Sequence, residues 1–186
     1  MTEHLTWYAI LVFAVAAERA AELLVALRNA RWSLARGGVE SGGGHYPAMV
    51  ALHTGLLAGC LFEAALGERP FIPALGWPML GALLGAQALR WWCVRALGRQ
   101  WNTRVIVVPG LPLATGGPYG WIRHPNYVAV VAEGIALPLV HTAWVTALVF
   151  TVLNALLLSV RIRCEEAALS AGAPTGGGRA PADVRP

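Results

Sequence analysis

Residues 117–134 read GPYGWIRHPNYVAVVAEG, a stretch in which polar residues lead into an apolar segment. The residue before a proline disfavours the helical region, whereas proline is favoured at the first helical position. The stretch therefore predicts a helix that begins at Pro125, with His124 at its N-cap. Free backbone N–H groups at that end would favour an anion, and Arg123 adds a positive charge there. An interfacial anchor of arginine and aromatic side chains stays open as the alternative.

The composition around this stretch is typical of a membrane protein. Of the 186 residues, 56% are hydrophobic and 13% are charged, and the mean hydropathy is +0.55. A soluble fold of this size cannot bury so much apolar surface, because small folds have a large surface relative to their volume. The net charge of +4 comes from short basic clusters beside apolar runs, where lipid headgroups are a more suitable partner than nucleic acid. Three cysteines without CxxC spacing do not indicate a disulfide framework or a metal site.

Five apolar runs predict an all-α integral membrane protein with about five transmembrane helices. The runs cover residues 5–27, 47–67, 75–97, 126–139 and 142–160. The last two runs are expected to form a helical hairpin with Pro138 and His141 at its bend. Its first arm has roughly 14 residues, which is short for about 30 Å of hydrocarbon at about 1.5 Å per residue. That arm should therefore be tilted, or shielded by neighbouring helices.

The loops predict the orientation and the domain limits. Arginines cluster after the first, third and fifth runs, and positively charged loops are retained in the cytoplasm. We therefore expect an outside N-terminus, a cytoplasmic C-terminus and polar clusters that all face the cytoplasm. Residues 1–169 are expected to form one helical domain, and residues 170–186, rich in Gly, Ala and Pro, a disordered tail. The glycine-rich residues 33–47 are expected to be a loop, either a lid or a connection.

A second polar cluster reads RIRCEEAAL at residues 161–169, at the end of the fifth run. Arg161 and Glu165 are four residues apart and so lie on one helix face. They could form a solvated ion pair at a helix end. Alternatively, one carboxylate of the cluster could accept hydrogen bonds from vicinal hydroxyl groups such as those of a ribose.

Glu133 lies about two helical turns inside an apolar arm. A carboxylate at that depth costs a few kcal/mol unless it is paired, protonated or facing a polar cavity, so the position indicates function. Other charged residues inside the first three runs are Glu18, Arg19, Glu22, Glu63 and Arg90. Glu18 and Glu22 could pair with Arg19 or with Arg90 across helices, and this structural use is as suitable for them as a catalytic role.

Together, GPYGWIRHPNY at 117–127, the hairpin that follows and RIRCEEAAL at 161–169 resemble the isoprenylcysteine carboxyl methyltransferase family. The resemblance covers residues 97–169, and ERAAELLVALRN at 18–29 is similar to the small bacterial branch of this family. The resemblance implies a helical membrane enzyme that binds S-adenosylmethionine at the cytoplasmic interface. It also implies methyl transfer to an oxygen, a carboxylate or acidic enol, of a lipid-like, membrane-partitioned acceptor.

The resemblance also implies which residues form the site. Arg161 and Arg123 would hold an anionic acceptor. The motifs do not assign Glu133, but it lies deeper, where the head of the acceptor could reach. Because such an acceptor is already ionised near neutral pH, no general base is required. The cofactor would be contacted by Leu113, Ala114, Tyr119, His124, Pro125, Asn126, Tyr127 and Glu165.

Two other function classes stay open at this point. Sterol-type reductases that use NADPH share a similar helical fold with an RHP-type motif. A non-catalytic membrane scaffold would use the buried charges only to pair helices. The sequence leaves the oligomeric state and the identity of the acceptor undetermined.

Overall fold

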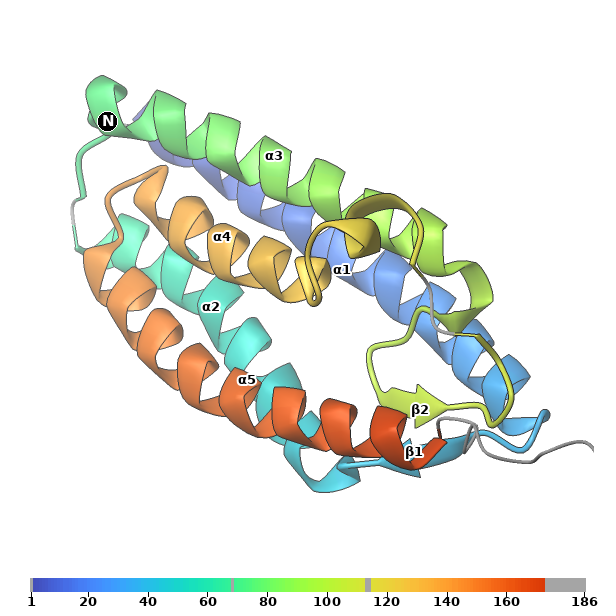
Figure 1. Cartoon of the computed structure of the whole chain (residues 1–186). Helices are drawn as coiled ribbons and strands as arrows, with labels where there is room; N and C mark the ends of the chain where they lie inside the picture. Colours follow the sequence, from blue (N-terminus) through green and yellow to red (C-terminus); the bar gives the residue numbers. More distant parts are fainter. Residues whose placement is uncertain (1, 68, 113–114, 173–186) are drawn as a thin grey trace, which may run out of the picture.

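The computed structural model describes residues 2–67, 69–112 and 115–172. Within them the chain folds into five α-helices, which confirms the all-α prediction (Figure 1). The helices are α1 (Thr2–Leu34), α2 (Tyr46–Leu66), α3 (Pro73–Leu97), α4 (Pro125–Leu139) and α5 (Trp144–Gly172). They correspond to the five apolar runs, although α1 and α5 continue well beyond the apolar part. Helix α5 includes the first three residues of the predicted tail, and the rest of that tail lies outside the described residues.

Prolines define where several helices begin. Helix α4 starts at Pro125 with His124 at the N-cap position, as predicted from the sequence, although the His124 side chain makes no capping hydrogen bond. Helices α2 and α3 also carry a proline in their first turn. Proline suits this position because its missing N–H is one that a helix leaves unpaired. The start of α5 is satisfied differently: the Glu63 carboxylate of α2 accepts hydrogen bonds from the backbone N–H groups of Val145 (3.1 Å) and Thr146 (2.7 Å).

A short two-stranded sheet lies at one end of the bundle. Strand β1 (Val39–Ser41) pairs antiparallel with β2 (Val105–Val107), and Glu40 lies opposite Ile106. The sequence analysis expected residues 33–47 to be a loop, and this was wrong for the middle of the segment. The strand forms because its partner approaches from a distant part of the chain, and period-2 patterning over three residues is too short to reveal it.

The helices pack around a core of apolar side chains. Helix α3 packs on α4, α4 on α5 and α5 on α2, while α1 contacts α2 (Figure 1). The core includes Tyr8, Val12, Leu56, Leu83 and Leu137. Helix α4 is enclosed by these neighbours, because eight of its residues are buried. The short hairpin arm is therefore shielded by other helices, as the sequence analysis expected.

Two helices of the described chain are long and apolar enough to cross a membrane, α2 with its preceding turn (Gly43–Leu66) and α5 (Trp144–Ser170). Helix α4 is apolar but shorter, and α1 and α3 carry the buried charged residues described below. The outer surface of the bundle is apolar: Phe13, Trp77, Leu148 and Leu156 are each at least 60% exposed. Large exposed apolar surfaces of this kind are typical of contact with a membrane or another protein.

Candidate functional site

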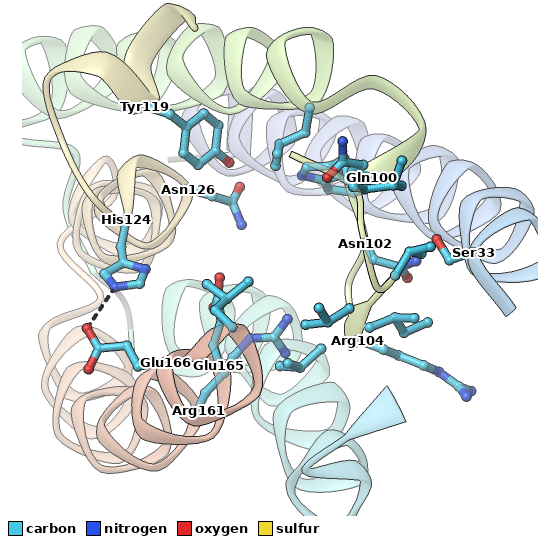
Figure 2. Close-up of a pocket in the computed structure, with 18 of the residues that line it drawn as sticks. Ser33, Gln100, Asn102, Arg104, Tyr119, His124, Asn126, Arg161, Glu165 and Glu166 are labelled. Atoms are coloured by element: carbon cyan, nitrogen blue, oxygen red, sulfur yellow. Dashed lines mark hydrogen bonds and ion pairs between the residues drawn. The ribbon is translucent and has the colours of Figure 1, made fainter. Parts of the chain in front are cut away.

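A cavity of about 520 Å³ lies at the end of the bundle where α4 begins and α5 ends. Its volume is within the range of roughly 300–1,000 Å³ that is usual for small-molecule sites. Figure 2 shows that it has three walls: Tyr119, His124 and Asn126 form one, the end of α5 forms the second, and the segment of Gln100, Asn102 and Arg104 forms the third.

The two sequence motifs meet in this cavity through one tyrosine. The Tyr127 hydroxyl donates a hydrogen bond to the Glu165 carboxylate and accepts one from Arg161 Nε at 2.9 Å. Arg161 is only 5% exposed, and its Nη1 also points to the sulfur of Met49 at 3.1 Å. The α4–α5 hairpin brings these groups together from positions 34 and 38 residues apart. A guanidinium and a carboxylate are thus held in fixed positions at the cavity wall.

A second contact between the motifs lies nearer to the surface. Glu166 Oε1 is 3.5 Å from His124 Nε2 and 3.6 Å from Arg123 Nη2. The His124 ring stacks on the Tyr127 ring, with 5.4 Å between centroids. The Arg123 side chain is 86% exposed, so its ion pair is screened by solvent. Glu166 is the neighbour of Glu165 in the second motif, and of these two carboxylates the family resemblance assigned a role in the site only to Glu165.

The third wall was missed by the sequence analysis. It is formed by the segment between α3 and β2, in which Trp101 is 3% exposed and Asn102 and Arg104 line the cavity. This segment is anchored on α1, because Asn29 Nδ2 donates to the Trp101 carbonyl oxygen at 2.7 Å. Arg104 forms an ion pair with Glu40 of β1 at 3.2 Å. No motif spacing marks these residues, and only the polar stretch that follows α3 could have drawn attention to them.

Several polar groups of the walls are buried and have no hydrogen-bond partner in the part of the chain that the structure describes. They are both amide atoms of Asn102, the amide oxygen of Asn126 and the indole nitrogen of Trp101. Buried polar groups in proteins are nearly always paired. These atoms therefore mark positions where a bound molecule with its own donors and acceptors, or water, would complete the hydrogen bonding.

Tyr119 adds a hydroxyl that stays protonated. Burial raises the pKa of this tyrosine above its ordinary value, and the neighbouring Cys93 thiol acts in the same direction. The short helix that carries Tyr119 (η3, Gly117–Gly120) packs closely on α3. Gly117 permits this, because its φ is +59° and a Cβ there would lie 2.9 Å from the indole nitrogen of Trp92. Tyr119 is therefore a neutral hydrogen-bonding group at the cavity wall.

The structure brings most of the predicted site residues together. The cavity is lined by Tyr119, Arg123, His124, Asn126, Tyr127, Arg161 and Glu165. Pro125 is buried at the start of α4 and does not line the cavity. Leu113 and Ala114 lie outside the described residues.

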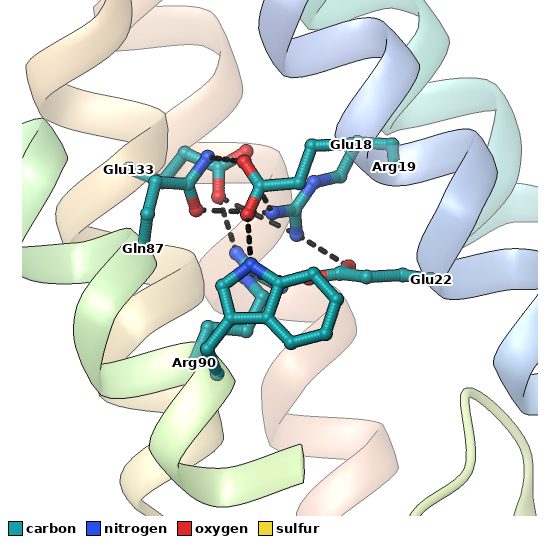
Figure 3. Close-up of polar contacts among 7 residues, drawn as sticks. Glu18, Arg19, Glu22, Gln87, Arg90 and Glu133 are labelled. Carbon is teal, nitrogen blue, oxygen red and sulfur yellow. Dashed lines mark hydrogen bonds and ion pairs between the residues drawn. The ribbon is translucent and has the colours of Figure 1, made fainter. Parts of the chain in front are cut away.

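Glu133 lies apart from the cavity, in a buried charge cluster between α1, α3 and α4 (Figure 3). It is 3% exposed and forms an ion pair with Arg90, and Arg19 Nη1 is 3.5 Å away. Arg19 also pairs with Glu22 at 2.7 Å, and the Glu18 carboxylate accepts hydrogen bonds from Gln87 and Trp91. The buried charge cluster comprises Glu18, Arg19, Glu22, Gln87, Arg90, Trp91 and Glu133. Its contacts are the cross-helix pairings that the sequence analysis considered as the structural alternative.

Comparison with known proteins identifies the family. The sequence model described as the isoprenylcysteine carboxyl methyltransferase (ICMT) family matches residues 79–171, which include both motifs. The Bacillus subtilis (strain 168) protein named "Uncharacterized protein YpbQ" is 39% identical over 164 residues, covering 88% of this chain and 95% of the relative. A Haemophilus influenzae protein, also named as uncharacterized, is 26% identical over 151 residues, covering 80% of this chain and 86% of the relative. No solved structure matches significantly. The chain thus belongs to the isoprenylcysteine carboxyl methyltransferase family of membrane methyltransferases, and its Bacillus relative is consistent with the small bacterial branch that residues 18–29 indicated.

Proposed function

We propose that this protein is an S-adenosylmethionine-dependent O-methyltransferase that acts on a carboxylate or acidic enol of a lipid-like acceptor. The observation that carries the proposal is the arrangement of Arg161, Tyr127 and Glu165. Together they place a buried cation and a carboxylate in one cavity, and the family match covers all three residues.

The donors and acceptors of the cavity fit S-adenosylmethionine. The Glu165 carboxylate would accept hydrogen bonds from the ribose hydroxyls or from the amino group. The unpaired amides of Asn102 and Asn126 and the neutral Tyr119 hydroxyl would bond to the remaining polar groups. When bound, this cofactor would supply a methyl group on a positively charged sulfur, and this sulfur would be the leaving group, as a neutral thioether, in transfer of the methyl carbon to an oxygen.

The residues of the chain then have to hold the acceptor and exclude water. The Arg161 guanidinium would bind the anionic oxygen and align it with the methyl group, which is the main requirement of a direct displacement. An acceptor that is already ionised needs no general base. His124 would position the Tyr127 ring, because the two rings are stacked. The Tyr127 hydroxyl, which accepts a hydrogen bond from Arg161, would in turn position the Arg161 side chain.

We also propose that the cavity faces the cytoplasm of a bacterial inner membrane, with the N-terminus outside. The support is the distribution of arginine: α1, α3 and α5 all end in or near arginine-containing segments, and these three helix ends lie at the cavity end of the bundle (Figure 1). Positive charges at one end of a membrane bundle favour the cytoplasmic side.

Calorimetry on the purified chain tests the cofactor assignment. We expect S-adenosylhomocysteine to bind the wild-type chain and to lose at least about tenfold in affinity in Glu165→Gln, because a charged hydrogen-bond acceptor is worth about 1.5–3 kcal/mol. The matched control is Glu3→Gln, at an exposed site in the first turn of α1. Binding of NADPH in place of S-adenosylhomocysteine would overturn the proposal in favour of a reductase. Incubation of membranes with radiolabelled S-adenosylmethionine and a lipid extract, followed by mass spectrometry, would identify the acceptor.

A further inference from the structure

A second, apolar cavity of about 790 Å³ lies between α2 and α5. We call it the α2–α5 groove; it runs from Ala48 to Gly59 on α2 and from Leu157 to Val145 on α5. Side chains along it are open to the surroundings, since Val149 is 50% exposed and Leu153 is 44% exposed. The groove is therefore accessible from the side of the bundle.

One end of the groove is closed. A Cβ added to Gly59 would lie 2.9 Å from the side chain of Thr146, so the two helices touch at this point. Just beyond it, the Glu63 carboxylate holds the backbone N–H groups of Val145 and Thr146. A chain lying along the groove would therefore meet a constriction at Gly59.

The other end of the groove lies close to the cavity at the start of α4 and the end of α5. Leu157 lies one helical turn before Arg161 on α5, and Arg161 Nη1 contacts the sulfur of Met49, the neighbour of Ala48. The same buried guanidinium thus lines the cavity and lies one helical turn from the end of the groove. An anionic group bound by Arg161 could continue into a hydrocarbon chain in the groove, because the groove residues nearest to Arg161, Ala48 and Leu157, are apolar.

We infer that the α2–α5 groove holds the hydrocarbon chain of the methyl acceptor and sets the length of that chain; this inference rests on the proposed function. From Ala48 to Gly59 the helix advances by about 17 Å at about 1.5 Å per residue. An extended alkyl chain with C–C bonds of about 1.5 Å and angles near about 111° advances about 1.25 Å per carbon. The groove therefore matches the length of an alkyl chain of about 13 carbon atoms carried by an anionic amphiphile.

Gly55 controls the middle of the groove. It lines the cavity, and a Cβ built on it would have no described atom within 4 Å, so a larger side chain can enter without a clash. Gly55 lies about 10 Å along α2 from Ala48, a distance that corresponds to about 8 carbon atoms. The Gly55→Leu substitution should therefore shorten the accepted chain from about 13 to about 8 carbons. Gly85→Leu on α3 is the matched control, since Gly85 is also open and does not line the groove.

The test uses the full chain in lipid nanodiscs and two readouts. The first is photo-crosslinking by fatty acids that carry a diazirine at the terminal carbon. Their chains of about 6 to about 18 carbons lie on both sides of the length of about 13 carbons calculated from the helix rise. In the wild-type chain the label of the acid with about 13 carbons should map to the peptides that contain Gly59 and Thr146. In Gly55→Leu the labelling should be strongest for the acid with about 8 carbons, and in Gly85→Leu it should not change.

The second readout is methyl transfer to the acceptor series. In Gly55→Leu we expect kcat/KM for the acceptor of about 13 carbons to fall at least about tenfold, as for other misfits in an apolar pocket, while that for the shorter acceptor changes less than about twofold. If kcat/KM depends on acceptor chain length in the same way in the wild type and in Gly55→Leu, the inference is overturned. The groove would then be a surface that contacts membrane lipid. Crosslinks to a second copy of α2, through the small residues Gly55 and Gly59, would overturn it in favour of a dimer contact.

The two proposals fail in different ways. Cofactor binding, measured by calorimetry with S-adenosylhomocysteine, should be unchanged in Gly55→Leu, because Gly55 lies outside the functional cavity. Absence of cofactor binding in the wild-type chain would refute the proposed function, while the crosslinking pattern would still report whether the groove holds a chain. Methyl transfer that does not depend on chain length would refute the groove inference alone.

Discussion

Replacement of Glu133 by Gln and of Arg90 by Gln should destabilise the protein to different extents. The reason is the charge balance of the buried charge cluster, in which three carboxylates (Glu18, Glu22 and Glu133) stand against two guanidinium groups (Arg19 and Arg90) and leave a formal charge of −1. Glu133→Gln brings that charge to zero. Arg90→Gln brings it to −2, with like charges held close together inside the bundle.

The contacts of the cluster give the size of each effect. Arg90 is 5% exposed, pairs with Glu133 and lies 3.6 Å from Glu22. Its loss leaves the three carboxylates of the cluster with one counter-charge, Arg19. Breaking a buried ion pair in this way costs about 3–5 kcal/mol. In Glu133→Gln the amide oxygen can still accept a hydrogen bond from Arg90, and Glu22 still neutralises Arg19 at 2.7 Å. The expected cost of that change is about 1–2 kcal/mol.

Thermal unfolding of the purified full chain in one detergent, followed by circular dichroism, measures both effects. Glu3→Gln, at the exposed start of α1, is the control for loss of a carboxylate and should have little effect. A loss of stability in Glu133→Gln that equals or exceeds that of Arg90→Gln would refute the charge argument.

The affinity of the same variants for S-adenosylhomocysteine separates two roles for Glu133. Unchanged affinity in folded Glu133→Gln would assign the residue to helix pairing. A loss of more than about tenfold, or about 1.4 kcal/mol, would support the site role inferred from its depth in the sequence.

Three further predictions concern the cavity wall. Tyr127→Phe removes the hydroxyl that bonds to Glu165, and should weaken S-adenosylhomocysteine binding about 5- to 30-fold by calorimetry, or roughly 1–2 kcal/mol; an unchanged affinity would contradict the assigned contact. Gly117→Ala should lower stability by about 1–3 kcal/mol, because its φ is +59°; Gly116→Ala, with φ of −84° and open space, should have little effect in the same thermal assay. The raised pKa of Tyr119 means that the folded state resists ionisation, so this residue contributes stability that is present below the ordinary tyrosine pKa of about 10 and is lost as the pH rises above it. Tyr119→Phe should make the alkaline loss of stability shallower, and an identical pH profile would show that Tyr119 does not contribute.

Much of the helical framework could be predicted from the sequence. Each of the five apolar runs became a helix, and α4 begins at Pro125 as predicted, because the geometry of proline acts on its immediate neighbours. The residues of the two motifs were also predicted. Their contact through Tyr127 was not, because a hydrogen bond from one helix to the next depends on how the hairpin packs.

Other parts of the site could not be predicted because they depend on distant segments. Strand β1 exists only through its pairing with β2, and the wall of Trp101 and Asn102 is fixed by Asn29 of α1. A three-residue strand and a loop without a motif give no periodic signal. Glu133 shows the same limit: its depth indicated a special environment, but Arg90, its counter-charge, lies on another helix.

The sequence by itself determined the helical class, the positions of the five helices, the start of α4 and the residues of two polar motifs. These features depend on local properties, namely apolar run length, proline geometry and the spacing of side chains on one helix face. The tertiary structure alone decided that Arg161, Tyr127 and Glu165 share a cavity, that Glu133 belongs to a buried charge cluster and that an apolar groove runs between α2 and α5. Each of these depends on which helix faces lie against one another, and that is fixed by packing across the whole bundle.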